Sequence, residues 1–306
     1  MKKFIFFSLL LVSLAACGQS ENKALTSQDL RTCILTNDNK PTENLKELLK
    51  IFNIEHNNTF EDIAKKVHTL WPYPSPDLIA GIDTYDFKPY EAKKPELRPL
   101  FEKLGLINPI KDTNQKKYMY AFVPSGWVGV TFCRLALLKE LWRKGIRFEK
   151  IVILTGQRDL TTGDWESDKN ITIDKTRPCK TEYELTKAVF SSFDLPEDMK
   201  KLPVIFVNTP KQKTEAGTLR EPYPEDQLLY WLETNPEPGD CLAATNQAYV
   251  RILENIFRNT LPKTFKNIDA VGYAHHQKYE TVQRWMYALA WLLHEEQLRV
   301  EKSQEL

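Results

Sequence analysis

The sequence lacks an excess of charge of either sign. Its 306 residues carry 42 basic and 41 acidic side chains, which gives a formal net charge of +1, and no block of basic residues stands out. Proteins that bind nucleic acid normally concentrate lysine and arginine on one surface. The composition therefore gives no support for nucleic acid as a partner.

Several short motifs are also missing. The sequence has no Cys-x-x-Cys pair, no cysteine–histidine spacing typical of zinc, and no EF-hand spacing in its acidic loop. It has neither Gly-x-Gly-x-x-Gly nor Gly-Lys-Ser/Thr, the usual nucleotide fingerprints, and no Gly-x-Ser-x-Gly motif of a hydrolase. We therefore expect no metal site, and the sequence leaves the cofactor unknown.

Residues 1–16 are typical of a bacterial signal peptide. Two lysines precede an apolar run from Phe4 to Val12, which is too short for an ordinary membrane span. The Leu-Ala-Ala-Cys that ends at Cys17 resembles a lipobox, which implies cleavage and lipidation (palmitate) of Cys17. Acyl chains would anchor the chain to a membrane, and Gly18 favours the outer membrane over the inner one. The alternative is an ordinary secretory peptide with a coincidental cysteine.

The rest of the chain divides into three parts. Residues 18–43 are polar and predict a tether, and residues 44–112 predict a small helical subdomain. Over 113–306, strands alternate with helices, which predicts an α/β fold, a three-layer sandwich with a mostly parallel, Rossmann-like sheet of about five strands. We expect the strand order 3-2-1-4-5. The predicted strands cover 118–123, 150–154, 203–207, 241–244 and 268–273.

Polar residues follow the first two predicted strands, at the rim of the sheet where ligands of such folds bind. Gly129 and Thr131 lie at the start of a helix, whose unpaired N–H groups could bind an anion, although a glycine turn used for packing explains them equally well. The second exit offers Gly156, Gln157 and Arg158. The guanidinium of Arg158 could bind a carboxylate or phosphate, or it could pair with the acidic loop that follows.

A helix start and a further strand exit complete the candidate site. Thr181 and Glu184 predict a capping box, which leaves Glu182 as a candidate catalytic base or as a residue that the helix dipole merely stabilises. Thr245 and Asn246 follow the fourth predicted strand. The side chains that we expect to share one pocket are Arg134, Arg158, Glu182 and Thr245.

The remaining cysteines and histidines give weaker hypotheses. Cys33 and Cys179 fall in predicted loops and would be the pair if a disulfide forms, because the other two cysteines fall in core elements. His275 and His276 follow the fifth strand, and at most one of two adjacent residues can face the rim. A lone histidine there is more often structural than catalytic.

The same rim residues resemble a known family over about 117–276. An arginine in the first helix, two strand exits and one helix start follow in order the pattern of the SanA/YdcF-like family, domain of unknown function 218. Gln157 stands where that family has a glycine, and Tyr249 stands where it has a histidine. The resemblance implies a divergent α/β protein of the bacterial envelope. The matching positions are Arg134, Thr155, Gly156, Thr181, Glu182, Thr245 and Asn246.

The sequence thus predicts an envelope-anchored, periplasm-facing lipoprotein. Its α/β domain would bind a small anionic substrate related to the envelope or cell wall, with turnover as an open question. The alternative is a non-catalytic envelope module that binds a protein or glycan partner. A nucleotide-sugar or cofactor transferase would need a phosphate fingerprint, which the sequence lacks.

Overall fold

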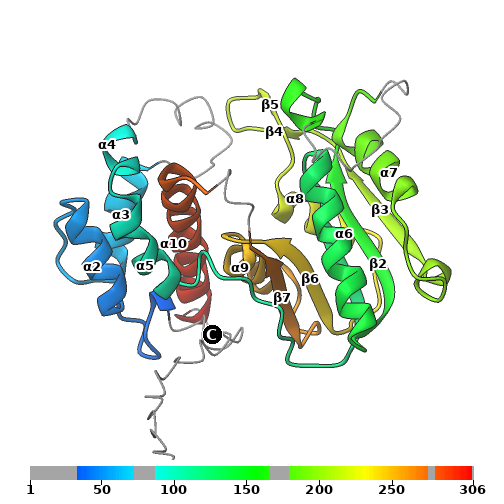
Figure 1. Cartoon of the computed structure of the whole chain (residues 1–306), viewed down its shortest axis with the longest axis horizontal. Coiled ribbons are helices and arrows are strands. Elements are labelled where there is room, and N and C mark those ends of the chain that lie inside the picture. The colour runs from blue at the N-terminus through cyan, green and yellow to red at the C-terminus, as the bar shows by residue number, and fades with distance from the viewer. Residues whose placement is uncertain (1–32, 72–86, 166–178, 275–279, 305–306) are drawn as a thin grey trace, which may run out of the picture.

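The computed structural model describes residues 33–71, 87–165, 179–274 and 280–304. Its centre is a sheet of five parallel strands between helices, which is a three-layer, Rossmann-like α/β fold (Figure 1). The order β3-β2-β1-β6-β7 is the predicted 3-2-1-4-5, since β6 and β7 are the fourth and fifth strands of this sheet. The strands are β1 (Lys117–Pro124), β2 (Arg147–Gly156), β3 (Val204–Thr209), β6 (Cys241–Asn246) and β7 (Ile268–Tyr273).

The strands are apolar because both faces of the sheet are covered. On β1, Tyr120 and Phe122 belong to one hydrophobic core, and Ala121 and Val123 belong to the other. Side chains of successive strand residues point to opposite faces, so a strand buried on both sides reads as a continuous apolar run. Helices α6 (Val128–Arg143) and α7 (Glu182–Ser192) contribute to the second core, and α8 (Pro224–Leu232) and α9 (Val250–Thr260) contribute to the first.

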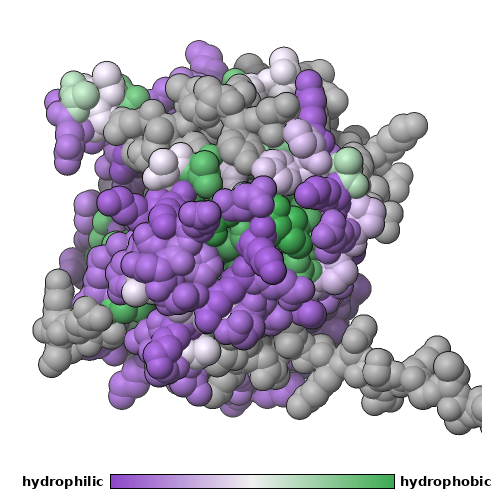
Figure 2. All heavy atoms as spheres, turned by 90° about the vertical axis from the view of Figure 1, so that its left-hand side faces the viewer, coloured by the Kyte–Doolittle hydropathy of each residue, from purple (hydrophilic) through white to green (hydrophobic). Residues whose placement is uncertain are grey.

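A group of helices lies beside the sheet and extends the first core. It consists of α2 (Glu43–Ile51), α3 (Phe60–Leu70), α4 (Lys88–Glu91), α5 (Lys94–Lys103) and the C-terminal α10 (Val282–Gln304). Figure 1 shows α10 between the N-terminal helices and α9. The outer face of this group is mainly hydrophilic, with a smaller hydrophobic area at its centre (Figure 2). Its apolar side chains therefore pack chiefly inward, as expected for amphipathic helices.

Two boundaries differ from the sequence prediction. The tether does not extend to residue 43, because Ile34 and Leu35 are buried in the first core and Thr42 caps α2. The last helix also contacts both parts of the chain, because α10 packs against α9 and against α3. In the contact with α3, Nε2 of His68 lies 3.0 Å from the Ala290 carbonyl oxygen. An isolated bridge also crosses the predicted boundary at 112, where Ile110 pairs with Gly272 of the edge strand β7.

Two further details concern local structure. A short antiparallel hairpin, β4 (Gln212–Lys213) and β5 (Leu219–Arg220), follows β3 and was not predicted, since strands of two residues leave no periodic pattern. Cys33 packs against the first core and Cys179 against the second, so these two cysteines do not bond to each other.

Candidate functional site

A cavity of about 300 Å³ opens at the carboxyl ends of the central strands, and we call it the rim cavity. One wall is polar and consists of Ser125, Arg134, Arg158, Glu182, Glu221 and Thr245. The opposite wall is largely aromatic and aliphatic, and it includes Tyr249, Ile252, Leu253, Ile256, Tyr287 and Trp291. A pocket with an apolar wall and a few convergent polar groups is the usual form of a small-molecule site.

The exits of β1 and β2 place the polar groups side by side. The Ser125 amide donates a hydrogen bond of 2.7 Å to the Leu154 carbonyl, so the two strands remain paired up to the rim. The loop after β2 then forms a bridge with the residue before α7, because the Glu182 amide donates to the Arg158 carbonyl at 2.9 Å. Residues that are 24 positions apart in the chain therefore meet at one edge of the cavity.

Arg134 is a buried cation that is held by neutral oxygens. Its side chain reaches back from α6, where its Nη1 donates to the carbonyl oxygens of Pro124 and Ser125 at 2.9 and 2.8 Å. Its Nε and Nη2 donate to the Asn246 amide oxygen at 3.2 and 2.6 Å. Burial lowers the pKa of Arg134, and the described residues offer it no ion pair.

The hydrogen bonds of Arg134 leave part of its capacity unused. A guanidinium carries five N–H donors. Four are used on the oxygens named above, which leaves one Nη2 N–H without an acceptor among the described residues. Since Arg134 lines the rim cavity and is only 8% exposed, a bound anion there would meet a largely desolvated positive charge.

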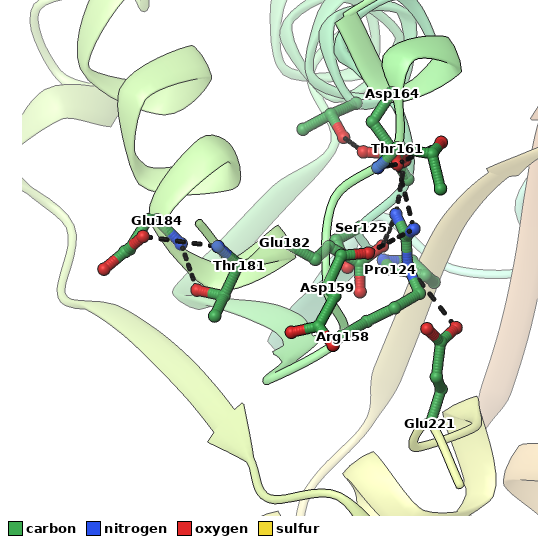
Figure 3. A network of polar contacts seen from close by, with 12 residues as sticks. Pro124, Ser125, Arg158, Asp159, Thr161, Asp164, Thr181, Glu182, Glu184 and Glu221 are labelled. Carbon is green, nitrogen blue, oxygen red and sulfur yellow. Dashed lines mark hydrogen bonds and ion pairs between the residues drawn. The ribbon is translucent and has the colours of Figure 1, made fainter. Parts of the chain in front are cut away.

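Arg158, in contrast, is surrounded by carboxylates (Figure 3). It binds Asp164 through both terminal nitrogens, one of them at 3.0 Å, and donates to Glu182 at 3.3 Å. The carboxylate of Glu221 lies 4.0 Å from its Nε. Burial lowers the pKa of Arg158, but the hydrogen bonds to Asp164 and the charge of Glu182 outweigh that effect and raise it above its usual value. Of the two roles that the sequence left open, pairing with the acidic loop is the one observed.

Glu182 is the first residue of α7 and is only 7% exposed. Thr181 and Glu184 form the predicted capping box, so the carboxyl group of Glu182 is not used to cap the helix (Figure 3). Burial raises the pKa of Glu182, while the charge of Arg158 and a hydrogen bond with the Ser125 side chain lower it, and the net shift is upward. A carboxyl group whose pKa moves toward neutrality is suited to proton transfer.

Glu221 adds a second titratable carboxyl group to the cavity. Burial raises its pKa, and the charge of Arg158 acts in the opposite direction. With Asp164 included, three carboxyl groups face the single guanidinium of Arg158. The polar wall therefore holds its excess of positive charge at Arg134 and its excess of negative charge around Arg158.

The structure brings together the four side chains that the sequence analysis expected to converge. The side chains that line the rim cavity as expected are Arg134, Arg158, Glu182 and Thr245. Asn246 is buried and holds Arg134 in place without lining the cavity. These positions meet because a parallel sheet aligns the carboxyl ends of its strands at one edge.

The other predicted ligand-binding residues lie outside the cavity. The Thr131 hydroxyl donates to the Gly126 carbonyl at 3.0 Å and is buried, and Gln157 is exposed. Gly129 does not line the cavity either. Gly156 acts through packing, because a Cβ there would lie 2.4 Å from Cγ of Pro222, which does line the cavity. Cys17, His275 and His276 lie outside the described residues.

The sequence analysis missed Glu221 on the polar wall and the residues of the apolar wall. Glu221 follows the unpredicted hairpin, so no strand exit pointed to it. Tyr249 and Trp291 lie in or next to helices whose apolar spacing predicts core packing, and the two rings pack against each other at 6.1 Å between centroids. Only a knowledge of how α10 packs on α9 could have placed Trp291 beside the strand exits.

The fold and the rim cavity define the class: a Rossmann-like α/β protein with a ligand-sized cavity at the carboxyl edge of its sheet. Comparison of the chain with protein-family models, with curated proteins and with solved structures finds no match. Within the described ranges, no group of three or more His, Cys, Asp or Glu side chains could hold a metal ion. None of the helices that the structure describes is both long and apolar enough to cross a membrane.

Proposed function

We propose that the rim cavity binds a small anionic molecule that also carries an apolar or ring-shaped part. The observation that supports this proposal most strongly is Arg134, a buried cation that has no carboxylate partner among the described residues and keeps one donor unused. Burying a charge without a counter-ion is costly, and an anionic ligand would supply that counter-ion. The aromatic rings of Tyr287 and Trp291 on the opposite wall would cover the apolar part.

Glu182 is our candidate for a catalytic base or acid in this cavity. Its raised pKa and its hydrogen bond with Ser125 would allow it to accept a proton from that hydroxyl or from a bound ligand. Arg158 would then stabilise the carboxylate whenever Glu182 loses its proton, since the two groups are 3.3 Å apart. On this proposal Arg134 binds the anion, and Glu182 moves the proton.

A non-catalytic module that binds a glycan is the second candidate. The aromatic wall supports it, because sugar rings stack on aromatic side chains and the rings of Tyr249, Tyr287 and Trp291 are adjacent. Under this alternative Glu182 and Arg158 form a structural ion pair. Replacing Glu182 would then leave the affinity for the glycan almost unchanged, and no turnover would be found.

We also propose that the protein is a lipid-anchored member of the bacterial envelope, and a divergent relative of the SanA/YdcF-like family. The first proposal rests on the lipobox that ends at Cys17, and the second on the order of the family-like residues. Three of those residues, Arg134, Glu182 and Thr245, line one cavity, as residues of a shared site should. The cavity would then face the periplasm, where a cell-wall-related anion is a fitting ligand.

The ligand proposal can be tested by a thermal-shift screen of the purified full-length protein. We suggest phosphorylated and carboxylated sugars, each beside its uncharged counterpart. A ligand at one hundred times its dissociation constant should stabilise the protein by about 2.7 kcal/mol. Stabilisation by uncharged sugars as strong as by their anionic forms would support the glycan module instead.

Arg134→Gln is the decisive variant for any ligand found in this way. Loss of a buried charged donor should weaken the binding of the anion by roughly ten- to a hundredfold. Arg143→Gln, on the exposed end of α6, is the matched control and should bind normally. Equal affinities for the two variants would contradict the proposal, provided that circular dichroism shows both to be folded.

The anchor is tested separately by Cys17→Ser. Without a lipidated cysteine the protein should move from the membrane fraction to the soluble fraction after cell breakage. Undiminished membrane association of Cys17→Ser would contradict the lipoprotein proposal and leave the ligand proposal untouched.

A further inference from the structure

A second cavity, which we call the arginine cavity, lies apart from the rim cavity, and its volume is about 290 Å³. It is formed by the loop before α2 together with α9 and α10, and it shares no residue with the rim cavity. The side chains that line it are Thr36, Asn37, Asn39, Arg251, Arg258 and Arg299. All six are polar and three are cationic.

The three arginines belong to a chain of ion pairs with two buried glutamates. Arg258 pairs with Glu254 at 2.9 Å, and Glu254 pairs with Arg251 at 3.1 Å. Arg251 also pairs with Glu296 at 2.7 Å, and Glu296 pairs with Arg299 at 2.7 Å. The chain therefore has three positive charges and two negative ones, and both glutamates are almost completely buried. The three cations all line the cavity.

The arginines also retain unused hydrogen-bond donors. Arg251 is only 3% exposed and uses two of its five N–H groups, and its buried Nε has no acceptor among the described residues. Within the part of the chain that the structure describes, Arg299 likewise uses two of its five N–H groups, one on Glu296 and one on Asn39 at 3.4 Å. Beside Asn39, the opposite charges of Asp38 and Lys40 compensate each other at 2.7 Å. This pair therefore adds no net charge beside Asn39.

From this cluster we infer that the arginine cavity is a second anion site, which binds a phosphate or diphosphate group. Guanidinium groups bind tetrahedral phosphate through paired N–H donors, and a multivalent oxyanion engages several of them at once. The side-chain N–H groups of Asn37 and Asn39 would provide neutral donors beside the arginines. The phosphate could be free, on a small metabolite, or part of a lipid headgroup, because all three present the same oxygens.

Pyrophosphate and inorganic phosphate are the probes for this site. Binding to the purified full-length protein is measured by isothermal titration calorimetry at constant ionic strength, with sodium chloride as the replacement salt. We expect saturable binding that is stronger for pyrophosphate than for phosphate. Absence of saturable binding of both ions would overturn the inference.

Variants locate the ion. The Arg299 side chain is about one third exposed. Arg299→Gln should weaken the binding of pyrophosphate at least tenfold, and Arg299→Lys should weaken it less. Asn37→Asp leaves the ion-pair chain intact and places a negative charge on the cavity wall, so it should weaken binding even if Arg299→Gln does not fold. Arg143→Gln and Arg134→Gln should bind as the wild type does. Loss of binding in Arg134→Gln alone would assign the ion to the rim cavity and refute the second site.

The source of the phosphate is decided by competition. Short-chain phosphatidic acid that remains monomeric in water should displace pyrophosphate if the cavity accepts lipid headgroups. Displacement only by soluble phosphate esters would identify a metabolite site. In either case the displacement must disappear in Asn37→Asp for the arginine cavity to be the site.

Discussion

The rim cavity and the arginine cavity bury positive charge in opposite ways. In the rim cavity, Arg134 is held by the carbonyl oxygens of Pro124 and Ser125 and by the amide of Asn246, all of them neutral. In the arginine cavity, Arg251 is held by two buried carboxylates, Glu254 and Glu296. Both arginines are at least nine-tenths buried, yet only one of them has counter-ions from the described residues.

The difference indicates which charge is kept for stability and which for binding. Neutral oxygens orient a guanidinium but compensate little of its charge, so burial lowers the pKa of Arg134. The carboxylates around Arg251 compensate its charge, and each arginine or glutamate of that chain depends on its neighbours. Removal of one member therefore leaves a buried unpaired charge, which is strongly destabilising.

The largest expected effect comes from breaking the ion-pair chain. Arg251→Met should lower the free energy of unfolding by about 3 to 5 kcal/mol, because Glu254 and Glu296 lose their shared partner. Arg134→Met should cost less, about 1 to 3 kcal/mol, because it leaves only neutral acceptors unsatisfied. Urea denaturation followed by circular dichroism measures both values.

An exposed arginine provides the reference for the two variants Arg251→Met and Arg134→Met. Arg143→Met should change the free energy of unfolding by no more than about 0.5 kcal/mol. If Arg134→Met destabilised the protein as much as Arg251→Met, the contrast between the two cavities would be wrong.

A substitution of intermediate effect should disturb the packing of the rim cavity and leave the arginine cavity unchanged. Gly156→Ala brings a Cβ to 2.4 Å from Pro222 and 2.9 Å from the Thr209 carbonyl oxygen, and we expect a loss of about 1 to 3 kcal/mol of stability. Because Pro222 lines the rim cavity, binding there should weaken, while pyrophosphate binding at the arginine cavity should not change. Gly163→Ala, whose Cβ would meet only Thr161 Oγ1 at 3.7 Å, is the control. Normal binding by Gly156→Ala at the rim would argue against this packing role.

A pH-dependent effect concerns two adjacent glutamates of α10. Burial raises the pKa of Glu295 to about 7, although hydrogen bonds with Asn259 and Trp291 act in the opposite direction. The folded protein therefore favours the protonated form, so the free energy of unfolding should fall as pH rises from about 4.5 to about 7. At about 1.4 kcal/mol per pKa unit we expect a fall of roughly 3 kcal/mol, which Glu295→Gln should abolish.

Its neighbour Glu296 should behave in the reverse manner. Burial raises its pKa, but the charges of Arg251 and Arg299 outweigh burial and lower it below 4.5. Its contribution to stability is therefore present above pH 4.5 and is lost only as the pH falls through its lowered pKa. Urea titrations at several pH values between about 3 and 8 test both residues. An unchanged profile in Glu295→Gln would refute the assignment.

Much of the fold could be predicted because its signals are local. Each of the five strands is a short apolar run, and strand–helix alternation implies parallel pairing. The capping box of Thr181 and Glu184 was legible from residue types alone. The hairpin β4–β5 and the buried residues Ile34 and Leu35 could not be predicted, because segments of two residues are too short to show a periodic pattern.

Strand exits and helix starts also identified four of the residues that line the rim cavity. Arg134, Arg158, Glu182 and Thr245 could be grouped because a parallel sheet brings strand ends to one edge. Gln157 and Thr131 lie on the same segments but face away, since the side-chain direction depends on local turns that the sequence does not specify.

By itself the sequence determined the strands, the helices, their order and the edge at which polar groups gather, because hydrophobic period and turn residues act over short distances. Only the tertiary structure decided which charges meet. The pairing of Arg158 with Asp164, the neutral setting of Arg134 and the chain from Arg258 to Arg299 depend on how α7, α9 and α10 pack on the sheet. Such contacts join residues far apart in sequence through side-chain shape and burial, and no local pattern encodes them.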